Sequence, residues 1–183
     1  MLSNWFDEST LGGHWSSLLG RHVWCSEAAF IASKAVHFGS HDTASVILDT
    51  AAGEDAKAAC DKIKTLGRKG IPGFNELEWK RVAFHMMLQA VTDKFEQRPE
   101  LRRSLLDTGN RFIVESAHYD RVWGIGHPHC NMKGKLGVVR CEDDDEFQVP
   151  PHEWHANLLG RALMMTRDRL RRAEACGCLW VGL

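Results

Sequence analysis

The sequence lacks several features that would place the protein in a familiar class at once. It has no run of about 18 consecutive apolar residues, so we expect no membrane-spanning helix. Its first residues carry no basic stretch followed by an apolar run, which argues against a secretory signal. The six cysteines follow no repeated spacing. We therefore expect a cytoplasmic protein whose cysteines are reduced thiols.

An excess of one charge is also missing. Lys and Arg total 23 and Asp and Glu total 24, a formal net charge of -1, which argues against general coating of nucleic acid or anionic membranes. No Gly-x-Ser-x-Gly turn and no Walker-type phosphate loop occurs, so a serine hydrolase and a P-loop enzyme find no support. The 183 residues, 44% of them apolar, suit a single compact domain over 1–183 with a sizeable core.

Helical periodicity dominates what is present, and it predicts a predominantly helical α+β fold with a few short strands. The stretch 123–151 shows no sustained period and is predicted to be a long loop, whose acidic run 142–146 forms a solvated surface. Strands are expected over Arg21–Trp24 and Arg111–Ser116. Cap and stop signals predict helices from Ser26 to Phe38, from Asp42 or Thr43 to Thr50, over Glu54–Leu66, Glu76–Gln97 and Pro99–Asp107, and over Ala156–Arg172.

The first predicted helix carries a lysine on a partly apolar face. Glu27, Ile31, Lys34 and Phe38 fall at helical spacing and share that face. Loss of solvent would lower the pKa of Lys34 toward a neutral, nucleophilic amine. Glu27 lies two turns away, about 10 Å along the axis, a spacing suited to flanking a sugar. The alternative is an amphipathic helix whose lysine extends to solvent.

A second candidate segment follows the predicted strand near residue 115. Asp120 could bind ribose hydroxyls or transfer a proton, and Trp123 could stack a base. Gly124 and Gly126 would let phosphate approach the backbone amides. The alternative is a structural turn that contains a core tryptophan.

Two further residue classes carry weaker signals. Most of the seven tryptophans are expected to be half-buried core residues, with one or two lining a pocket. Loop histidines and cysteines could hold zinc, but no pair shows the spacing of a zinc finger, so no metal site is expected. The residues considered for zinc are His127, His129, Cys130, Cys141, His152 and His155.

Four ordered blocks together resemble the NADAR (NAD- and ADP-ribose-associated), or YbiA-like, family. The resemblance runs from about Trp24 to Arg172, and the insert 127–151 belongs to this chain alone. The chain also has Ala28, Ala29 and Ile31 where the family usually carries His, aromatic and Gln residues. The four blocks are Trp24–Lys34, Gly67-Arg68 with Trp79–Phe95, Leu105–Gly126, and Asn157–Arg167.

The resemblance implies an N-glycosidase without a cofactor, which cleaves the bond between ribose C1 and a base nitrogen. Lys34 is implied to attack C1 of a ring-opened ribose and form a Schiff base. The carboxylates of Glu27 and Asp120 would stabilise positive charge on the sugar. Trp79 and Trp123 are implied to form aromatic walls of the substrate site. Arg68 and the backbone of Gly124 and Gly126 would contact phosphate or sugar. Asn157 would orient the substrate through hydrogen bonds.

The residues leave the substrate open. An ADP-ribosylated guanine, free or in nucleic acid, or a related NAD-derived nucleotide is preferred over a phosphoribosylamino-pyrimidine intermediate of riboflavin synthesis. The changes at Ala28, Ala29 and Ile31 keep a rival class in view, a non-catalytic binder of ADP-ribose-like nucleotides. A zinc-stapled structural domain is a third possibility and would contain stoichiometric zinc. No membrane partner is expected, and the oligomeric state stays open.

Overall fold

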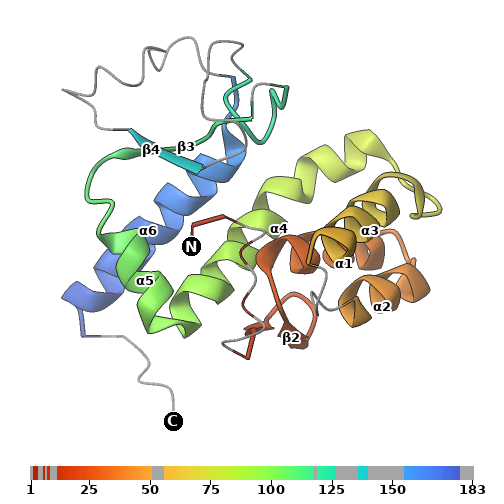
Figure 1. Ribbon diagram of the computed structural model, residues 1–183, viewed down its shortest axis with the longest axis horizontal. Coiled ribbons are helices and arrows are strands. Elements are labelled where there is room, and N and C mark those ends of the chain that lie inside the picture. Colours follow the sequence, from red (N-terminus) through yellow and green to blue (C-terminus); the bar gives the residue numbers. More distant parts are fainter. Residues whose placement is uncertain are drawn as a thin grey trace. The chain divides into compact units, whose positions relative to one another are not determined.

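The computed structural model describes residues 2–3, 6, 8, 12–50, 56–117, 119–126, 136–139 and 155–177. Helices make up most of this part of the chain, with short strands in two antiparallel pairs, so the prediction of a predominantly helical α+β fold is confirmed (Figure 1). The chain divides into two compact units, Asn4–Arg98 and Pro99–Leu183 with Met1–Ser3. None of the described helices combines the length and the apolar composition that crossing a bilayer requires.

The first unit is a group of helices preceded by a small hairpin. Strand β1 was not predicted from the sequence; it pairs antiparallel with β2, with His14 opposite Val23. Four helices follow, and α1 packs against α2, α3 and α4 (Figure 1). The elements are β1 His14–Ser16, β2 Arg21–Val23, α1 Ser26–His37, α2 His41–Asp49, α3 Ala56–Lys69 and α4 Glu76–Gln97.

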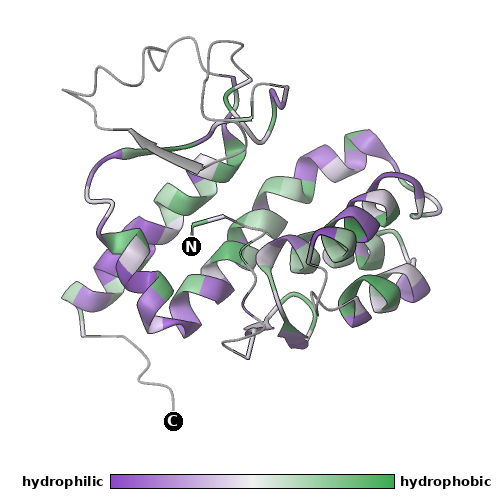
Figure 2. Cartoon of the chain, in the orientation of Figure 1, coloured by the Kyte–Doolittle hydropathy of each residue, from purple (hydrophilic) through white to green (hydrophobic). Residues whose placement is uncertain are grey.

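Helix α1 is the centre of the first unit. Its predicted cap was Ser26, but Cys25 is the cap, because its Sγ accepts the Ala28 amide at 3.4 Å and Ser26 is already helical. Small side chains allow neighbouring helices to approach closely, and Ala28 and Ala29 are fully buried against them. Along the helices, apolar residues alternate with polar ones, as amphipathic packing requires (Figure 2).

Helix α3 runs further than the sequence indicated. We predicted that Gly67 would end it, but the helix continues to Lys69. A Cβ on Gly67 would lie 2.7 Å from Cγ2 of Ile31 in α1. The glycine therefore serves close packing between α1 and α3 instead of a helix stop.

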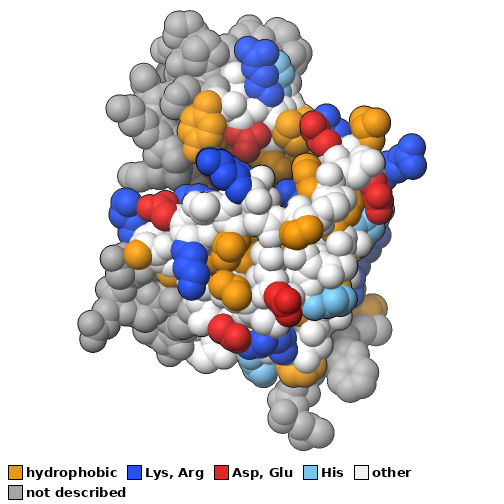
Figure 3. Space-filling model, turned by 90° about the vertical axis from the view of Figure 1, so that its right-hand side faces the viewer, with side chains coloured by type: hydrophobic (Ala, Val, Ile, Leu, Met, Phe, Trp, Pro, Cys, Tyr) orange, Lys and Arg blue, Asp and Glu red, His pale blue; other side chains and the backbone are white. Residues whose placement is uncertain are grey.

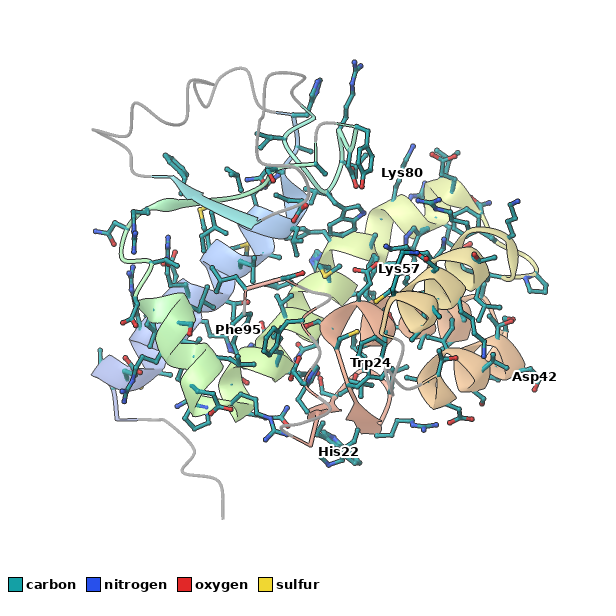
Figure 4. The ribbon with its side chains drawn as sticks, in the orientation of Figure 1. His22, Trp24, Asp42, Lys57, Lys80 and Phe95 are labelled. Carbon is teal, nitrogen blue, oxygen red and sulfur yellow. The ribbon has the colours of Figure 1, made fainter. Side chains whose placement is uncertain are left out.

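The boundaries of α2 and α4 illustrate two kinds of cap. The predicted α4 is confirmed over its full length, and the Asn75 side chain accepts the Glu78 amide at 3.1 Å. For α2 the cap is Ser40, not Asp42 or Thr43, and its side chain makes no capping bond. Trp24, labelled in Figure 4, fixes the chain after α2 through a 2.7 Å hydrogen bond from Nε1 to the Thr50 carbonyl.

The second unit combines two helices with one strand pair. The predicted strand near residue 113 is confirmed as β3, and β4 lies inside the stretch 123–151 that we predicted to be loop throughout. Ile113 pairs with Val138 across the antiparallel ladder. Helix α6 packs on both α5 and β3. The elements are α5 Pro99–Leu106, β3 Phe112–Glu115, β4 Leu136–Val139 and α6 Leu158–Ala175.

Other predictions fall outside the described residues and are not tested there. These are the helix start at Glu54, the acidic run 142–146 and five of the six residues considered for zinc, His127, His129, Cys130, Cys141 and His152.

Candidate active site

Helix α1 presents the two predicted catalytic side chains of the first unit. Glu27 occupies the first turn, where the helix dipole stabilises a carboxylate, and Lys34 lies in the last turn. Both side chains are half-buried. Ile31, between them on the same face, is buried against α3. The predicted face therefore exists, with its apolar centre packed and its two charged ends at the surface.

The Lys34 amine is held by a carbonyl and by aromatic rings from outside α1. Its Nζ donates a hydrogen bond to the Gly67 carbonyl at 2.9 Å. It also lies 3.9 Å from the ring centre of Phe74 and 5.8 Å from that of Trp79. The Gly67 carbonyl belongs to the last turn of α3, where helix carbonyls lack intrahelical partners. The amine therefore sits between a carbonyl and an aromatic face.

The protonation of Lys34 follows from this environment. Partial burial lowers the pKa of Lys34 below its ordinary value of 10.5. The carbonyl and the ring faces favour the ammonium form, but loss of solvent is the larger effect. Within the described ranges no carboxylate lies within ion-pair distance of Nζ. The amine can therefore lose its proton more easily than an ordinary surface lysine.

Trp79 forms one wall near the amine but is mainly a core residue. It is only 8% exposed and contacts Phe30 at 5.3 Å between ring centres. Phe38 stands between Trp79 and Phe74, at 6.4 Å and 5.3 Å from their ring centres. The predicted aromatic wall at Trp79 thus belongs to a larger ring cluster.

Phe74 is the residue of this cluster that the sequence analysis missed. It is 41% exposed and directly follows Gly73, which has a φ of 73°. The Gly73-Phe74-Asn75 order, a turn glycine and an aromatic residue before a helix cap, was the available signal. The predicted Arg68 follows Gly67 on α3 and is exposed, and its role in substrate binding stays a prediction.

In the second unit, Asp120 organises its own turn. Its Oδ1 accepts the backbone amides of Val122 at 2.9 Å and Trp123 at 2.8 Å. This is the local side-chain bonding typical of aspartate in turns. Trp123 is half-buried beside it. The structure therefore supports the turn interpretation for one Asp120 oxygen, and the predicted catalytic role of this carboxylate stays a prediction.

The two glycines of this segment serve the fold. A Cβ on Gly124 would lie 3.0 Å from the carbonyl oxygens of Glu115, Ala117 and Asp120, which leaves no room for a side chain. Gly126 has a φ of 58°, and its amide donates to the Ala117 carbonyl at 3.2 Å. That amide is bonded within the segment, and the predicted phosphate contact of the two glycines stays a prediction.

Asn157 likewise has structural partners. Its Oδ1 accepts the Glu115 amide at 3.1 Å and its Nδ2 donates to the Ile113 carbonyl at 3.0 Å. It adopts left-handed backbone angles with a φ of 45°, which is why α6 begins at Leu158 and not at the predicted Ala156. Its side chain therefore joins α6 to β3, and its predicted role in orienting a ligand stays a prediction.

A carboxyl group that we did not predict lies at the end of β3. Burial raises the pKa of Glu115, and the negative charge of Asp120 raises it further. Two carboxyl groups with different environments are a common source of acid–base pairs in sugar chemistry. The sequence signal was a single acidic residue ending an apolar strand.

The predicted residues thus divide between the two units. Lys34, Glu27, Trp79 and Arg68 belong to the first, with Lys34 and Trp79 in one cluster. The remaining predicted residues, Asp120, Trp123, Gly124, Gly126 and Asn157, belong to the second. No group of three potential metal ligands lies within the described part of either unit.

Comparison with known proteins gives a consistent family assignment. An N-glycosidase of Acanthamoeba polyphaga mimivirus is 35% identical over 58% of this chain and 55% of its own. Protein irg-1 of Caenorhabditis elegans is 30% identical over 80% of this chain and 60% of its own. N-glycosidase YbiA of Escherichia coli is 35% identical over 39% of this chain and 44% of its own.

These matches span about half the length of the relatives, so they describe a shared domain. The family model covers residues 1–171, which includes nearly all of both units. It also contains the four sequence blocks that first suggested the relationship. The chain belongs to the NADAR domain family.

Proposed function

We propose that this protein is an N-glycosidase that cleaves the bond between ribose C1 and a base nitrogen through a Schiff base on Lys34. The observation that carries the proposal is the state of the Lys34 amine. It is half-buried, its pKa is lowered, and no carboxylate pairs with it within the described ranges. A neutral amine with access to solvent is what a Schiff-base nucleophile requires. Relatives named N-glycosidase support the same class of reaction.

The proposed step conserves atoms and charge. The ribose ring opens when its ring oxygen takes a proton from solvent and the C1–O bond breaks, which leaves a protonated imine between C1 and the base nitrogen. The Lys34 lone pair adds to C1, and one proton of the amine passes to the base nitrogen. The C1–N bond to the base then breaks with its electron pair going to that nitrogen, which leaves a Schiff base on Lys34. Water hydrolyses this Schiff base to the free aldose and the lysine amine.

Glu27 and Asp120 keep the electrostatic role implied by the family resemblance, stabilisation of positive charge on the sugar. The proposed substrate is an ADP-ribosylated guanine, free or in nucleic acid, or a related NAD-derived nucleotide. Ala28, Ala29 and Ile31 are buried, and Ile31 packs against Gly67 of α3. These substitutions therefore serve the packing of α1, which supports catalysis over simple binding. No cofactor is required by this scheme.

Borohydride trapping tests the nucleophile. ADP-ribose and borohydride should give a covalent adduct on Lys34, detected by peptide mass spectrometry, and Lys34→Ala should lose both the adduct and at least about 10³-fold of turnover. Lys80→Ala is the matched control, since Lys80 is a surface lysine that points outward from α4 (Figure 4). Tight ADP-ribose binding without any adduct, unchanged in Lys34→Ala, would replace the proposal with a binding protein.

A second assay tests which of the two candidate substrates the protein prefers. An oligonucleotide carrying ADP-ribosylated guanine should release ADP-ribose on incubation with the protein. Release of ribose phosphate from the phosphoribosylamino-pyrimidine, with none from the oligonucleotide, would reverse that order and keep the N-glycosidase reaction.

A further inference from the structure

The face of the Phe74 ring is occupied in an unusual way. The Lys34 amine lies over it, 3.9 Å from the ring centre. The amine lies over the ring and therefore occupies a place where a planar base could stack. Phe74 is nevertheless 41% exposed, although an aromatic side chain of this size normally gains by full burial. The ring is therefore accessible and directly beside the proposed nucleophile.

The support behind Phe74 makes it a firm platform. Phe38 contacts the ring edge-on, with ring centres 5.3 Å apart and planes at 76°. Phe38 in turn lies against Trp79, which is anchored in the core of the first unit. The Phe74 amide closes a turn onto the Ile71 carbonyl at 3.4 Å. A ring held by a neighbouring aromatic side chain and open toward solvent can present a face to a ligand.

We propose that Phe74 is the stacking platform for the leaving base, and that the base replaces the Lys34 amine on the ring face when substrate binds. This inference rests on the proposed N-glycosidase function and names a residue that selects its substrate. The chemical class recognised is a planar heterocyclic base attached to C1. Stacking tolerates different bases, since each has a π-face, so Phe74 would favour base-bearing sugars over aliphatic glycosylamines.

The exchange also links binding to reactivity. On the ring face, the amine receives cation–π stabilisation that exists only while it is protonated. A base stacked on Phe74 removes that stabilisation and leaves the amine next to the ribose to which the base is attached. Lys34 then loses its proton more readily at the point where the neutral amine is needed.

The test distinguishes recognition of the base from recognition of the sugar. Phe74→Ala should raise KM for the ADP-ribosylated guanine oligonucleotide about ten-fold or more, and Phe74→Tyr should stay within about two-fold of wild type. Deoxyguanosine monophosphate, a mimic of the released base, should bind Phe74→Ala at least about ten-fold more weakly by calorimetry. Leu77→Ala is the matched control, because Leu77 is also apolar and is 72% exposed in the first turn of α4.

Trapping with ribose 5-phosphate distinguishes the two possible failures. This aldose carries no base, so Lys34 of Phe74→Ala should still form the borohydride adduct. An adduct in both proteins together with equal KM and equal nucleotide affinity would overturn the role of Phe74 and leave the N-glycosidase proposal intact. No adduct in the wild-type protein with either sugar would overturn the proposed function, and with it the inference that rests on it.

Discussion

Two lysines of the first unit both have a lowered pKa, but they differ in whether a substrate can reach the amine. Burial lowers the pKa of both Lys34 and Lys94. Lys34 is half-buried at the surface end of α1, and Lys94 is fully buried in α4. A lowered pKa therefore identifies a candidate nucleophile only when the amine can also be reached.

Lys94 is enclosed by charge and by rings. Its Nζ lies 3.5 Å from the Glu8 carboxylate, and Glu8 Oε2 lies 2.8 Å from His14 Nδ1. Phe6 and Phe95 lie 5.1 Å and 5.4 Å from the amine. These residues are all buried except Phe6, which is half-buried. The cluster fixes the segment before β1 onto α4, and its amine has no route to a substrate.

The largest expected effect comes from breaking this ion pair. Lys94→Met should lower the free energy of unfolding by about 3–5 kcal/mol, because it leaves the Glu8 carboxylate buried without its cation. Lys34→Met should cost less than about 1 kcal/mol, since its amine is half-buried. Urea unfolding of both variants measures the contrast.

A double variant supplies the control for that measurement. Lys94→Met with Glu8→Gln removes both charges and should recover part of the loss. Equal destabilisation by Lys34→Met and Lys94→Met would mean that the two lysines do not differ in the way described above.

A smaller effect is expected where α3 meets the Lys34 helix. Gly67→Ala would place a methyl group 2.7 Å from Ile31 Cγ2. Overpacking of this kind costs about 1–3 kcal/mol, offset by about 1 kcal/mol of better helix propensity. The shift should also move the Gly67 carbonyl and weaken its bond to Lys34, so adduct formation should change while Lys94 is unaffected. A double variant that adds Ile31→Ala to Gly67→Ala should lose less stability than the sum of the two single variants. Strict additivity of the two losses would contradict close packing at this contact.

The smallest expected effect is a shift in the pH at which the Lys34 amine becomes reactive. Only the neutral amine reacts with electrophiles, so labelling of Lys34 rises with pH through its pKa and then levels off. Since burial lowers that pKa, half-maximal labelling should fall below pH 10.5. Lys94 should stay unlabelled in the folded protein at every pH tested, because it is fully buried. Peptide mass spectrometry after reductive methylation reads both sites, and half-maximal labelling of Lys34 at or above pH 10.5 would contradict partial burial as the dominant effect.

Local signals predicted the elements that carry the site more reliably than the contacts within it. The α4 bounds and the Asn75 cap follow from propensity and capping, which act over a few residues. The shared face of Glu27 and Lys34 follows from helical spacing. By contrast, we wrongly predicted that Gly67 ends α3, because the sequence does not distinguish a glycine at a close helix contact from a glycine at a helix end.

The second unit shows the same limit of prediction from sequence. Asp120, Gly126 and Asn157 were predicted to meet a ligand, and all three bond to nearby backbone. Turn aspartates and ligand-binding aspartates share the same residue type and the same glycine-rich neighbours. Only the backbone path after β3 shows which amides and carbonyls are already used.

By itself, the sequence determined the helical character of the chain, the face that presents Lys34, the start of α4 and the family, because these depend on periodicity, caps and ordered motifs. Only the tertiary structure decided which atoms surround each amine. The Gly67 carbonyl and the Phe74 ring come from segments more than thirty residues away, and Lys94 becomes inaccessible through Glu8, more than eighty residues earlier. Burial depends on what packs over a side chain, and distant segments supply that packing.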